Sequence, residues 1–325
     1  RAGVHAGTSA EPSSILVLGG GIGGLNLAMR LSQMPWKTKP QVKLIDPKDR
    51  YVFLPLLIDY ATGVVELDEF APTFHDLLEE APGVQHIQSV ASEVDWRRRK
   101  VELSQGDEAK LDFDAVVIAS GSLGARQAPV LPGLSDALAS GKALCFRSLT
   151  DAENLRERLK SLSSVAIVGA GYVGVELAAG LAEVLPEAAA DGKIALFGSR
   201  FLPGCEEANQ KRSAEFINKL GIFRNEGRVT SIDEDGLTWA SADGESRKHE
   251  CDLVIVTGAL APSDSKEKLE LTAPLKDSVE KGRAVIDEYL RIAPGVFCLG
   301  DASAGAPATG QIAMQQAEAA AWNIY

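Results

Sequence analysis

The stretch that decides the fold is Ile15-Leu16-Val17-Leu18-Gly19-Gly20-Gly21-Ile22-Gly23-Gly24. Its aliphatic half predicts a buried strand, and residues 25–31, directly after the glycines, have the apolar spacing of a helix. A second apolar run, residues 42–45, ends on Asp46. Strand, glycine turn, helix and strand in this order form one βαβ unit.

The glycines of this turn have the spacing of a dinucleotide-binding loop. Glycine permits a tight turn, close approach of the backbone to a pyrophosphate, and close packing of the helix on the strand. The N-terminus of the helix adds amide donors and a partial positive charge. Asp46 lies 22 residues after Gly24, where an acid can bind ribose hydroxyls. We therefore predict a dinucleotide site at Gly19, Gly21, Gly23, Gly24 and Asp46.

The same order of elements returns later in the chain. An aliphatic run at residues 165–168 precedes Gly169-Ala170-Gly171-Tyr172-Val173-Gly174, and the patterns of a helix and a strand follow. This predicts a second dinucleotide site at Gly169, Gly171 and Gly174.

The second site lacks the ribose-binding acid. The position that matches Asp46 is Gly198, which is followed by Ser199 and Arg200. A missing acid removes the repulsion against a 2′-phosphate, and an arginine can accept one. Ser199 and Arg200 therefore predict that this site accepts NADPH; the alternative is that Arg200 only points into solvent.

Three later strands are also expected to end in small residues. Residues 114–119 precede Ser120-Gly121, residues 252–256 precede Thr257-Gly258, and residues 295–299 precede Gly300-Asp301. The first two strands each follow a polar stretch that is rich in hairpin signals. The predicted cofactor-binding residues therefore also include Ser120, Gly121, Gly258, Gly300 and Asp301.

The order of the elements indicates that one domain is inserted into the other. The first dinucleotide fold opens the chain, and Gly300-Asp301 closes it at the far end. We predict an α/β fold of two nested Rossmann-type domains. A discontinuous domain covers residues 12–150 and 282–325, and an inserted domain covers residues 151–281; resemblance to known flavoproteins implies FAD for the first domain and NAD(P)H for the second. A helix is expected to start near Thr150 or Asp151, with one of them as its cap.

Composition excludes several classes of protein. The 325 residues carry a net charge of −12, which disfavours nucleic-acid binding because phosphate contacts need a basic surface. No apolar run reaches the ~18 residues of a transmembrane helix. The four cysteines are far apart, and the four histidines form no cluster, so neither a redox pair nor a metal site is predicted. The small, polar start of the chain resembles a mature N-terminus or the remnant of a removed targeting segment.

The two motifs and Gly300-Asp301 together resemble the flavoprotein reductases that bind two dinucleotides. Within that group, residues 53–57 with residues 61–63 are similar to a segment of the type II NAD(P)H:quinone oxidoreductases. Residues 310–316 are similar to the Ala-Gln-x-Ala-x-Gln quinone-site segment of the same family, with Gly310 in place of alanine and Met314 where some members have histidine. The resemblance implies FAD as the cofactor, NAD(P)H as the co-substrate and a membrane quinone as the acceptor.

The resemblance also implies roles for three polar side chains. Gln311 and Gln315 would line the quinone pocket; the alternative is a solvated helix face. Glu176 would be a carboxylate at the junction of nicotinamide and flavin, or a helix-dipole carboxylate on the first turn of its helix. Asp301 would hold the ribityl chain of the flavin, or cap the next helix.

Residues 51–78 are similar to the plastid branch of the family. This implies a plastid location, at the thylakoid or plastoglobule surface, with the mitochondrial inner membrane as the alternative. Members of the family attach to the membrane through a C-terminal amphipathic region, which is expected to be absent from this chain. A homodimer or a membrane supercomplex is compatible with the resemblance.

The predicted activity is the transfer of two electrons from NAD(P)H through the flavin to a quinone of the plastoquinone or ubiquinone type, without proton pumping. Two alternatives stay open. A sulfide:quinone oxidoreductase would need reactive cysteines, for which Cys145 and Cys298 are the candidates. A flavoprotein-like structural subunit of a membrane supercomplex would need no chemistry at all.

Overall fold

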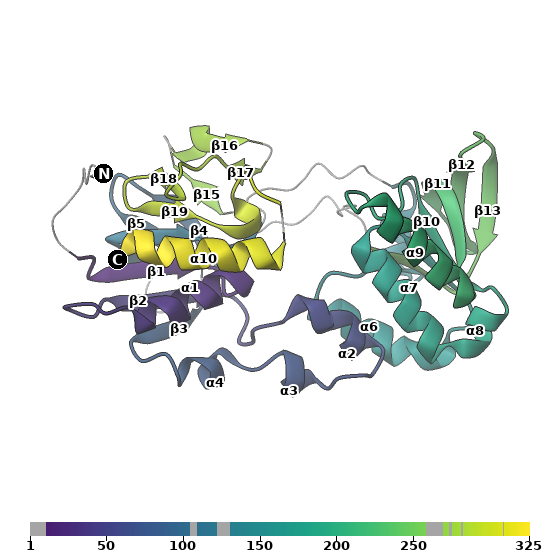
Figure 1. Cartoon of the computed structure of the whole chain (residues 1–325), viewed down its shortest axis with the longest axis horizontal. Coiled ribbons are helices and arrows are strands. Elements are labelled where there is room, and N and C mark those ends of the chain that lie inside the picture. The colour runs from purple at the N-terminus through teal and green to yellow at the C-terminus, as the bar shows by residue number, and fades with distance from the viewer. Residues whose placement is uncertain are drawn as a thin grey trace. The chain divides into compact units, whose positions relative to one another are not determined.

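The computed structural model describes residues 11–104, 109–121, 131–257, 269–272, 275–280, 282–307 and 309–325. The chain divides into two compact units (Figure 1). The first unit comprises Arg1–Phe53, Ala71–Arg126 and Ser265–Tyr325, and the second comprises Leu54–Phe70 and Gln127–Asp264.

The first unit is built on a six-stranded sheet with the order β18-β19-β7-β1-β2-β3. All neighbours pair in parallel except β18 and β19, which are antiparallel. The strands are β1 (Ser14–Leu18), β2 (Gln41–Asp46), β3 (Val84–Gln88), β7 (Ala115–Ile118), β18 (Arg291–Ala293) and β19 (Val296–Cys298).

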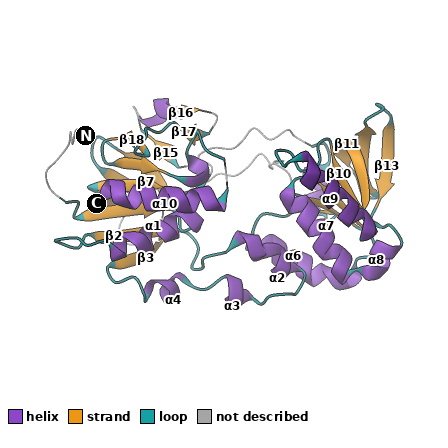
Figure 2. Ribbon diagram, in the orientation of Figure 1, coloured by secondary structure: helices purple, strands orange, loops and turns teal. Residues whose placement is uncertain are grey.

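Two helices cover one face of this sheet, α1 (Ile22–Gln33) and α10 (Gly310–Ile324), and they contact each other (Figure 2). Alternate residues of β1 point to opposite faces. Ile15 and Val17 therefore pack against α1 and α10, whereas Leu16 and Leu18 pack on the other side. Short helices of the same unit are α4 (Phe74–Leu78), η3 (Leu275–Ser278) and η4 (Gly300–Ala302).

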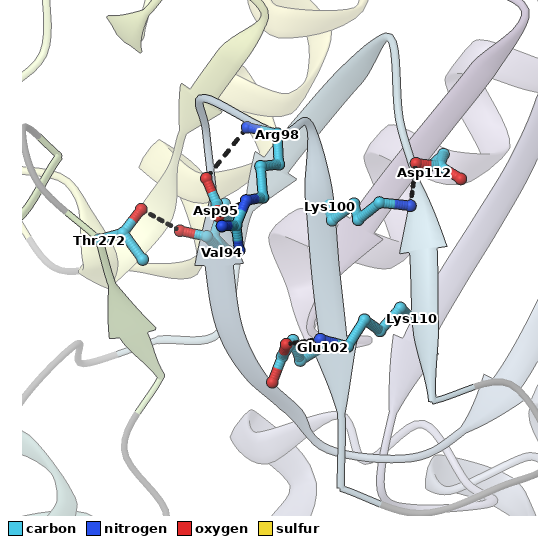
Figure 3. A network of polar contacts seen from close by, with 8 residues as sticks. All are labelled: Val94, Asp95, Arg98, Lys100, Glu102, Lys110, Asp112 and Thr272. Carbon is cyan, nitrogen blue, oxygen red and sulfur yellow. Dashed lines mark hydrogen bonds and ion pairs between the residues drawn. The ribbon is translucent and has the colours of Figure 1, made fainter.

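A small sheet, with the order β15-β4-β5-β6, contributes to the core on the other side. It is a meander of β4 (Ala91–Asp95), β5 (Lys100–Leu103) and β6 (Lys110–Asp112), to which β15 (Glu270–Leu271) adds in parallel. Lys100 pairs with Asp112 at 2.7 Å, and Lys110 pairs with Glu102 (Figure 3). These exposed pairs add little stability, so the apolar face holds the meander in place. A hairpin of β16 (Val279–Glu280) and β17 (Arg283–Ala284) lies nearby in the sequence.

The second unit has a seven-stranded sheet with the order β13-β12-β11-β10-β9-β14-β8. Its parallel part comprises β8 (Ala143–Cys145), β9 (Val165–Val168), β10 (Ile194–Gly198), β11 (Phe223–Ile232) and β14 (Leu253–Val256). β12 (Gly236–Ser241) and β13 (Ser246–Glu250) extend β11 as an antiparallel meander. The longer helices are α6 (Leu149–Arg158), α7 (Tyr172–Val184) and α9 (Glu207–Lys219), and the short ones are α5 (Leu134–Ala139), η2 (Leu159–Ser161) and α8 (Pro186–Ala190).

A short segment before residue 71 also belongs to the second unit, with η1 (Leu54–Leu56), α2 (Leu57–Ala61) and α3 (Leu67–Phe70). The guanidinium of Arg156 lies 4.9 Å from the ring centroid of Tyr60 and donates a hydrogen bond to Glu66 Oε1 at 2.8 Å. α2 also packs closely on α7, because a Cβ at Gly180 would lie 3.2 Å from Ile58 Cγ2. These contacts fix the segment on α6 and α7.

The two units repeat the same local structure. In the first, Asp114 Oδ2 accepts hydrogen bonds from the amides of Ser13 and Ser14, just before and at the start of β1. In the second, Asp252 Oδ2 accepts them from the amides of Ser163 and Ser164, just before β9. The prediction of two Rossmann-type folds in one chain is confirmed.

The compact units differ from the predicted domain boundaries at residues 150 and 281. Residues 131–150 lie in the second unit because β8 pairs with β14, and residues 269–280 lie in the first because β15 pairs with β4. The cap of α6 is Ser148 rather than Thr150 or Asp151: it accepts the amide of Asp151, whose carboxylate accepts the amide of Ser148 in return. No helix of the described residues is long and apolar enough to cross a membrane.

Candidate functional site

The first glycine turn lies between β1 and α1. Gly19 has φ +106°, and a Cβ there would lie 2.6 Å from Ala119 O. A Cβ at Gly24 would lie 1.8 Å from Gly19 O, so both positions require glycine. Gly21, in contrast, has no atom within 4 Å of its Cβ position, which leaves open space at the N-terminus of α1. Such space beside free helix amides suits a pyrophosphate. Gly23 has a different role. A Cβ at Gly23 would lie 2.4 Å from Leu299 Cδ1, so the absence of a side chain there lets α1 pack closely on Leu299.

Asp46 is held directly beside this turn. Its Oδ2 accepts a hydrogen bond from the amide of Gly20 at 2.7 Å, and its Oδ1 accepts one from the amide of Lys48 at 2.9 Å. A carboxylate oxygen can accept further hydrogen bonds, so Asp46 can still receive two ribose hydroxyls. Two aromatic neighbours were not predicted: the ring of Phe74 lies 4.5 Å from that of His86, and burial lowers the pKa of His86.

The other predicted residues of the first unit follow β7 and β19, which are adjacent parallel strands beside β1. Ser120 and Gly121 follow β7 after Ala119, and Gly121 has φ +77° with open space around it. Gly300 has φ +67°, and the side chain of Asp301 is exposed. The structure therefore brings the predicted flavin residues together at one edge of the sheet, where the carboxyl ends of the parallel strands lie.

Gln316 on α10 fixes the turn that carries Asp301. Its Oε1 accepts hydrogen bonds from the amide of Gly300 at 2.7 Å and from Ser303 Oγ at 3.3 Å. Gln311 and Gln315, one helical turn apart, are exposed, as is Met314 at 49%. The sequence had not distinguished the structural role of the half-buried Gln316 from the exposed glutamines, since all three are in one polar and alanine-rich segment.

The second glycine turn has the same construction between β9 and α7. Gly169 has φ +121°, a Cβ at Gly174 would lie 1.8 Å from Gly169 O, and the space around Gly171 is open. Thr257 Oγ1 donates hydrogen bonds to the carbonyls of Val168 and Gly169 and so ties β14 to the turn. Gly258, another predicted cofactor-binding residue, lies outside the described residues.

The end of β10 is closed to a side chain. A Cβ at Gly198 would lie 2.6 Å from Ala170 Cβ and 2.8 Å from Ala170 N. The following loop folds back on the turn, because Leu202, with φ +42°, donates its amide to Ala170 O at 2.8 Å. Ser199 and Arg200 lie at the start of this loop and are exposed.

Glu176 was predicted to lie on the first turn of its helix. It is instead the fifth residue of α7, which is beyond the first turn. A helix dipole acts mainly within the first turn, which weakens the interpretation of Glu176 as a dipole-stabilising residue. Burial, and then the negative charge of Asp59 on α2, raise the pKa of this carboxyl. A raised pKa near an open turn is typical of groups that take part in chemistry.

A match to a known protein family agrees with the dinucleotide-binding role that the two glycine turns indicate. The model described as pyridine nucleotide-disulphide oxidoreductase matches residues 13–317. The chain belongs to this family. Its relatives include the demethylphylloquinone reductase NdbB of Synechocystis sp., which is 36% identical over 98% of this chain and 80% of that protein. The alternative NAD(P)H-ubiquinone oxidoreductase C1, chloroplastic/mitochondrial, of Arabidopsis thaliana is 31% identical over 96% of this chain and 66% of that protein.

Within the pyridine nucleotide-disulphide oxidoreductases, these relatives confirm the resemblance to the type II NAD(P)H:quinone oxidoreductases. The fold is also that of the sulfide:quinone oxidoreductase of Aquifex aeolicus, with a TM-score of 0.78 and 19% identity over 97% of this chain and 76% of that one. At this identity, the likeness shows the fold alone.

The burial of Cys298 and Cys145 disfavours nucleophilic chemistry at their sulfur atoms. Cys298 is fully buried in β19, and burial raises the pKa of its thiol far above its ordinary value. Burial also raises the pKa of the Cys145 thiol. Since the thiolate is the reactive form, burial disfavours the nucleophilic chemistry that a sulfide:quinone mechanism would need at these two cysteines. Among the described residues, no group of three or more His, Cys, Asp or Glu side chains could hold a metal ion.

Proposed function

We propose that this chain is an FAD-dependent NAD(P)H:quinone oxidoreductase of the type II class, which passes two electrons from NAD(P)H to a membrane quinone without pumping protons. The observation that carries this proposal is the pair of complete glycine turns, each with an open central glycine at a helix N-terminus. Two such turns suit two different dinucleotides in one chain. The names of the relatives add the quinone as acceptor.

The residues of the first unit fit FAD. The open space at Gly21 would receive the pyrophosphate, the carboxylate of Asp46 would receive the ribose hydroxyls, and Asp301 the ribityl hydroxyls. Ser120, Gly121 and Gly300 would let the backbone approach the flavin. When bound, FAD supplies two-electron chemistry that a nicotinamide and a quinone can both use.

The residues of the second unit fit a nicotinamide dinucleotide. Gly169, Gly171 and Gly174 would form its pyrophosphate turn, and Ser199 and Arg200 would lie toward the 2′-position of its ribose. Burial and the charge of Asp59 raise the pKa of the Glu176 carboxyl and so favour its protonated form. We assign NAD(P)H to this unit and FAD to the first.

Gln311 and Gln315 would bind the quinone. They lie four residues apart on α10, which places them on one face of the helix, and both are exposed. Their amide groups can donate hydrogen bonds to quinone carbonyls. Peripheral attachment to a plastid membrane is part of the same proposal, and the chloroplastic/mitochondrial name of the Arabidopsis relative supports it.

An anaerobic stopped-flow experiment on the flavin-loaded protein tests the proposal. NADH or NADPH should bleach the flavin absorbance, and a short-chain plastoquinone should restore it. Gln311→Ala and Gln315→Ala should slow the second step only, whereas Gln41→Ala, at an exposed glutamine of β2, should change neither. Bleaching without recovery would refute the quinone assignment, and a protein that binds no flavin would refute the enzyme itself.

A further inference from the structure

The carboxyl end of β10 cannot carry the acid that recognises a ribose. In the first unit, glycine stands in the turn at Gly20 and the carboxylate stands on the strand at Asp46. In the second unit the arrangement is reversed, because Ala170 stands in the turn and Gly198 on the strand, with 2.6 Å left for any added Cβ. In each unit, only one of the two facing residues has a side chain, Asp46 in the first unit and Ala170 in the second. Recognition of the ribose in the second unit must therefore come from another element.

β11, the strand next to β10, carries a carboxylate at the position opposite Gly198. β11 pairs with β10 in parallel, and Glu226 is the register partner of Gly198. Adjacent strands lie about 4.8 Å apart, and register partners point to the same face of a sheet. A side chain at Gly198 would point to the face of the sheet on which Ala170 lies. The side chain of Glu226 therefore points to this face too, one strand away from Gly198. Its side chain is 61% exposed and so is available to a ligand.

An arginine holds this carboxylate in place. Arg224 lies two residues before Glu226 on β11, and its Nη2 is 2.9 Å from Glu226 Oε1. The guanidinium carbon of Arg224 is also 5.0 Å from the ring centroid of Phe201, in the loop that Leu202 fixes to Ala170. The ion pair is thereby connected to the glycine turn through one aromatic ring and one backbone hydrogen bond.

We propose that Glu226 is the ribose-recognising carboxylate of the second dinucleotide site, and that its pairing with Arg224 sets the preference between NADH and NADPH. This inference rests on the proposed binding of NAD(P)H by the second unit. A carboxylate accepts hydrogen bonds from free ribose hydroxyls and repels a 2′-phosphate. Arg224 reduces that repulsion and can itself receive the phosphate, so the site takes both nucleotides and favours the unphosphorylated one.

The test measures binding of the adenosine half alone, by calorimetry on the flavin-loaded full chain. The probes are ADP-ribose and 2′-phospho-ADP-ribose. Glu226→Gln should shift the ratio of the two affinities at least about tenfold toward the phosphorylated probe, since one like-charge contact is removed. Arg224→Gln should shift it in the opposite direction. Glu215→Gln, an equal charge change at an exposed position of α9, should leave the ratio unchanged.

Three results would overturn the inference in distinguishable ways. If both probes bind and Glu226→Gln leaves their ratio unchanged, Glu226 does not read the ribose, while the proposed function stands. If Arg200→Gln shifts the ratio and Glu226→Gln does not, the loop and not β11 is the discriminator. Failure of the wild-type protein to bind either probe would refute the NAD(P)H site of the second unit itself.

Discussion

Gly198→Ala should destabilise the protein, because the added methyl group would enter space that Ala170 already fills. The new Cβ would lie 2.6 Å from Ala170 Cβ and 2.8 Å from Ala170 N, against ordinary contacts of about 3.5–4.0 Å between carbon atoms. Overpacking of this kind typically costs about 1–3 kcal/mol. Each kcal/mol corresponds to about 2–4 °C in the melting temperature of a unit of this size. We therefore expect the transition of the second unit to fall by about 2–12 °C.

The assay is differential scanning calorimetry of the wild type, Gly198→Ala, Ala170→Gly and the double variant. In the double variant, Ala170→Gly removes the contact between the two Cβ atoms but leaves the backbone contact at 2.8 Å. The double variant should therefore regain part of the stability that Gly198→Ala loses. The coupling between the two sites should be about 1 kcal/mol, within the range for residues in contact. An unchanged melting temperature for Gly198→Ala would refute the reasoning, and so would a double variant whose losses simply add.

Three further predictions concern single side chains. Asp46→Ala should weaken FAD binding about 10–100-fold, since a hydrogen bond to a charged group contributes about 1.5–3 kcal/mol, as a flavin-fluorescence titration would show. Gln316→Ala should lower the free energy of unfolding by about 1–3 kcal/mol in urea titration, because the amide of Gly300 loses its acceptor. Asp59→Asn should lower the pKa of Glu176 toward its usual value without restoring it fully, because burial also raises that pKa; carboxyl NMR shifts over a pH titration would measure it, and an unchanged titration would contradict the coupling.

The raised pKa of Glu176 also has a consequence for stability. A carboxyl with a raised pKa holds more protons in the folded state than in the unfolded one, so its contribution is most favourable below the unfolded pKa and is lost as the pH rises through the folded pKa. Replacing Glu176 by glutamine should therefore raise stability at neutral pH relative to the wild type and change little in acid, as thermal unfolding at both pH values would show. The opposite pH trend would contradict the direction of the shift.

The local chemistry of the chain was predictable where neighbours in the sequence determine it. Each glycine turn requires positive φ at its first glycine and close approach at its last, and both requirements are met within six residues. Asp46 and Gly300 could be placed for the same reason, because Asp46 ends the apolar run of one strand and Gly300 follows the apolar run of another. A strand, a turn and a helix start are short-range features, so the sequence alone determined the fold class and the positions of the two glycine turns.

Pairing between distant segments was decided only by the tertiary structure. Nothing local in residues 143–145 indicates that they pair with β14, or that residues 54–70 pack on α6 and α7, and the predicted domain boundaries therefore differ from the compact units. The steric exclusion at Gly198, the register that places Glu226 beside it, and the role of Gln316 all depend on atoms more than ten residues away. The sequence determined which turns have the backbone that a phosphate site needs, because backbone conformation is local, whereas the side chains proposed to read the ribose depend on which strands become neighbours.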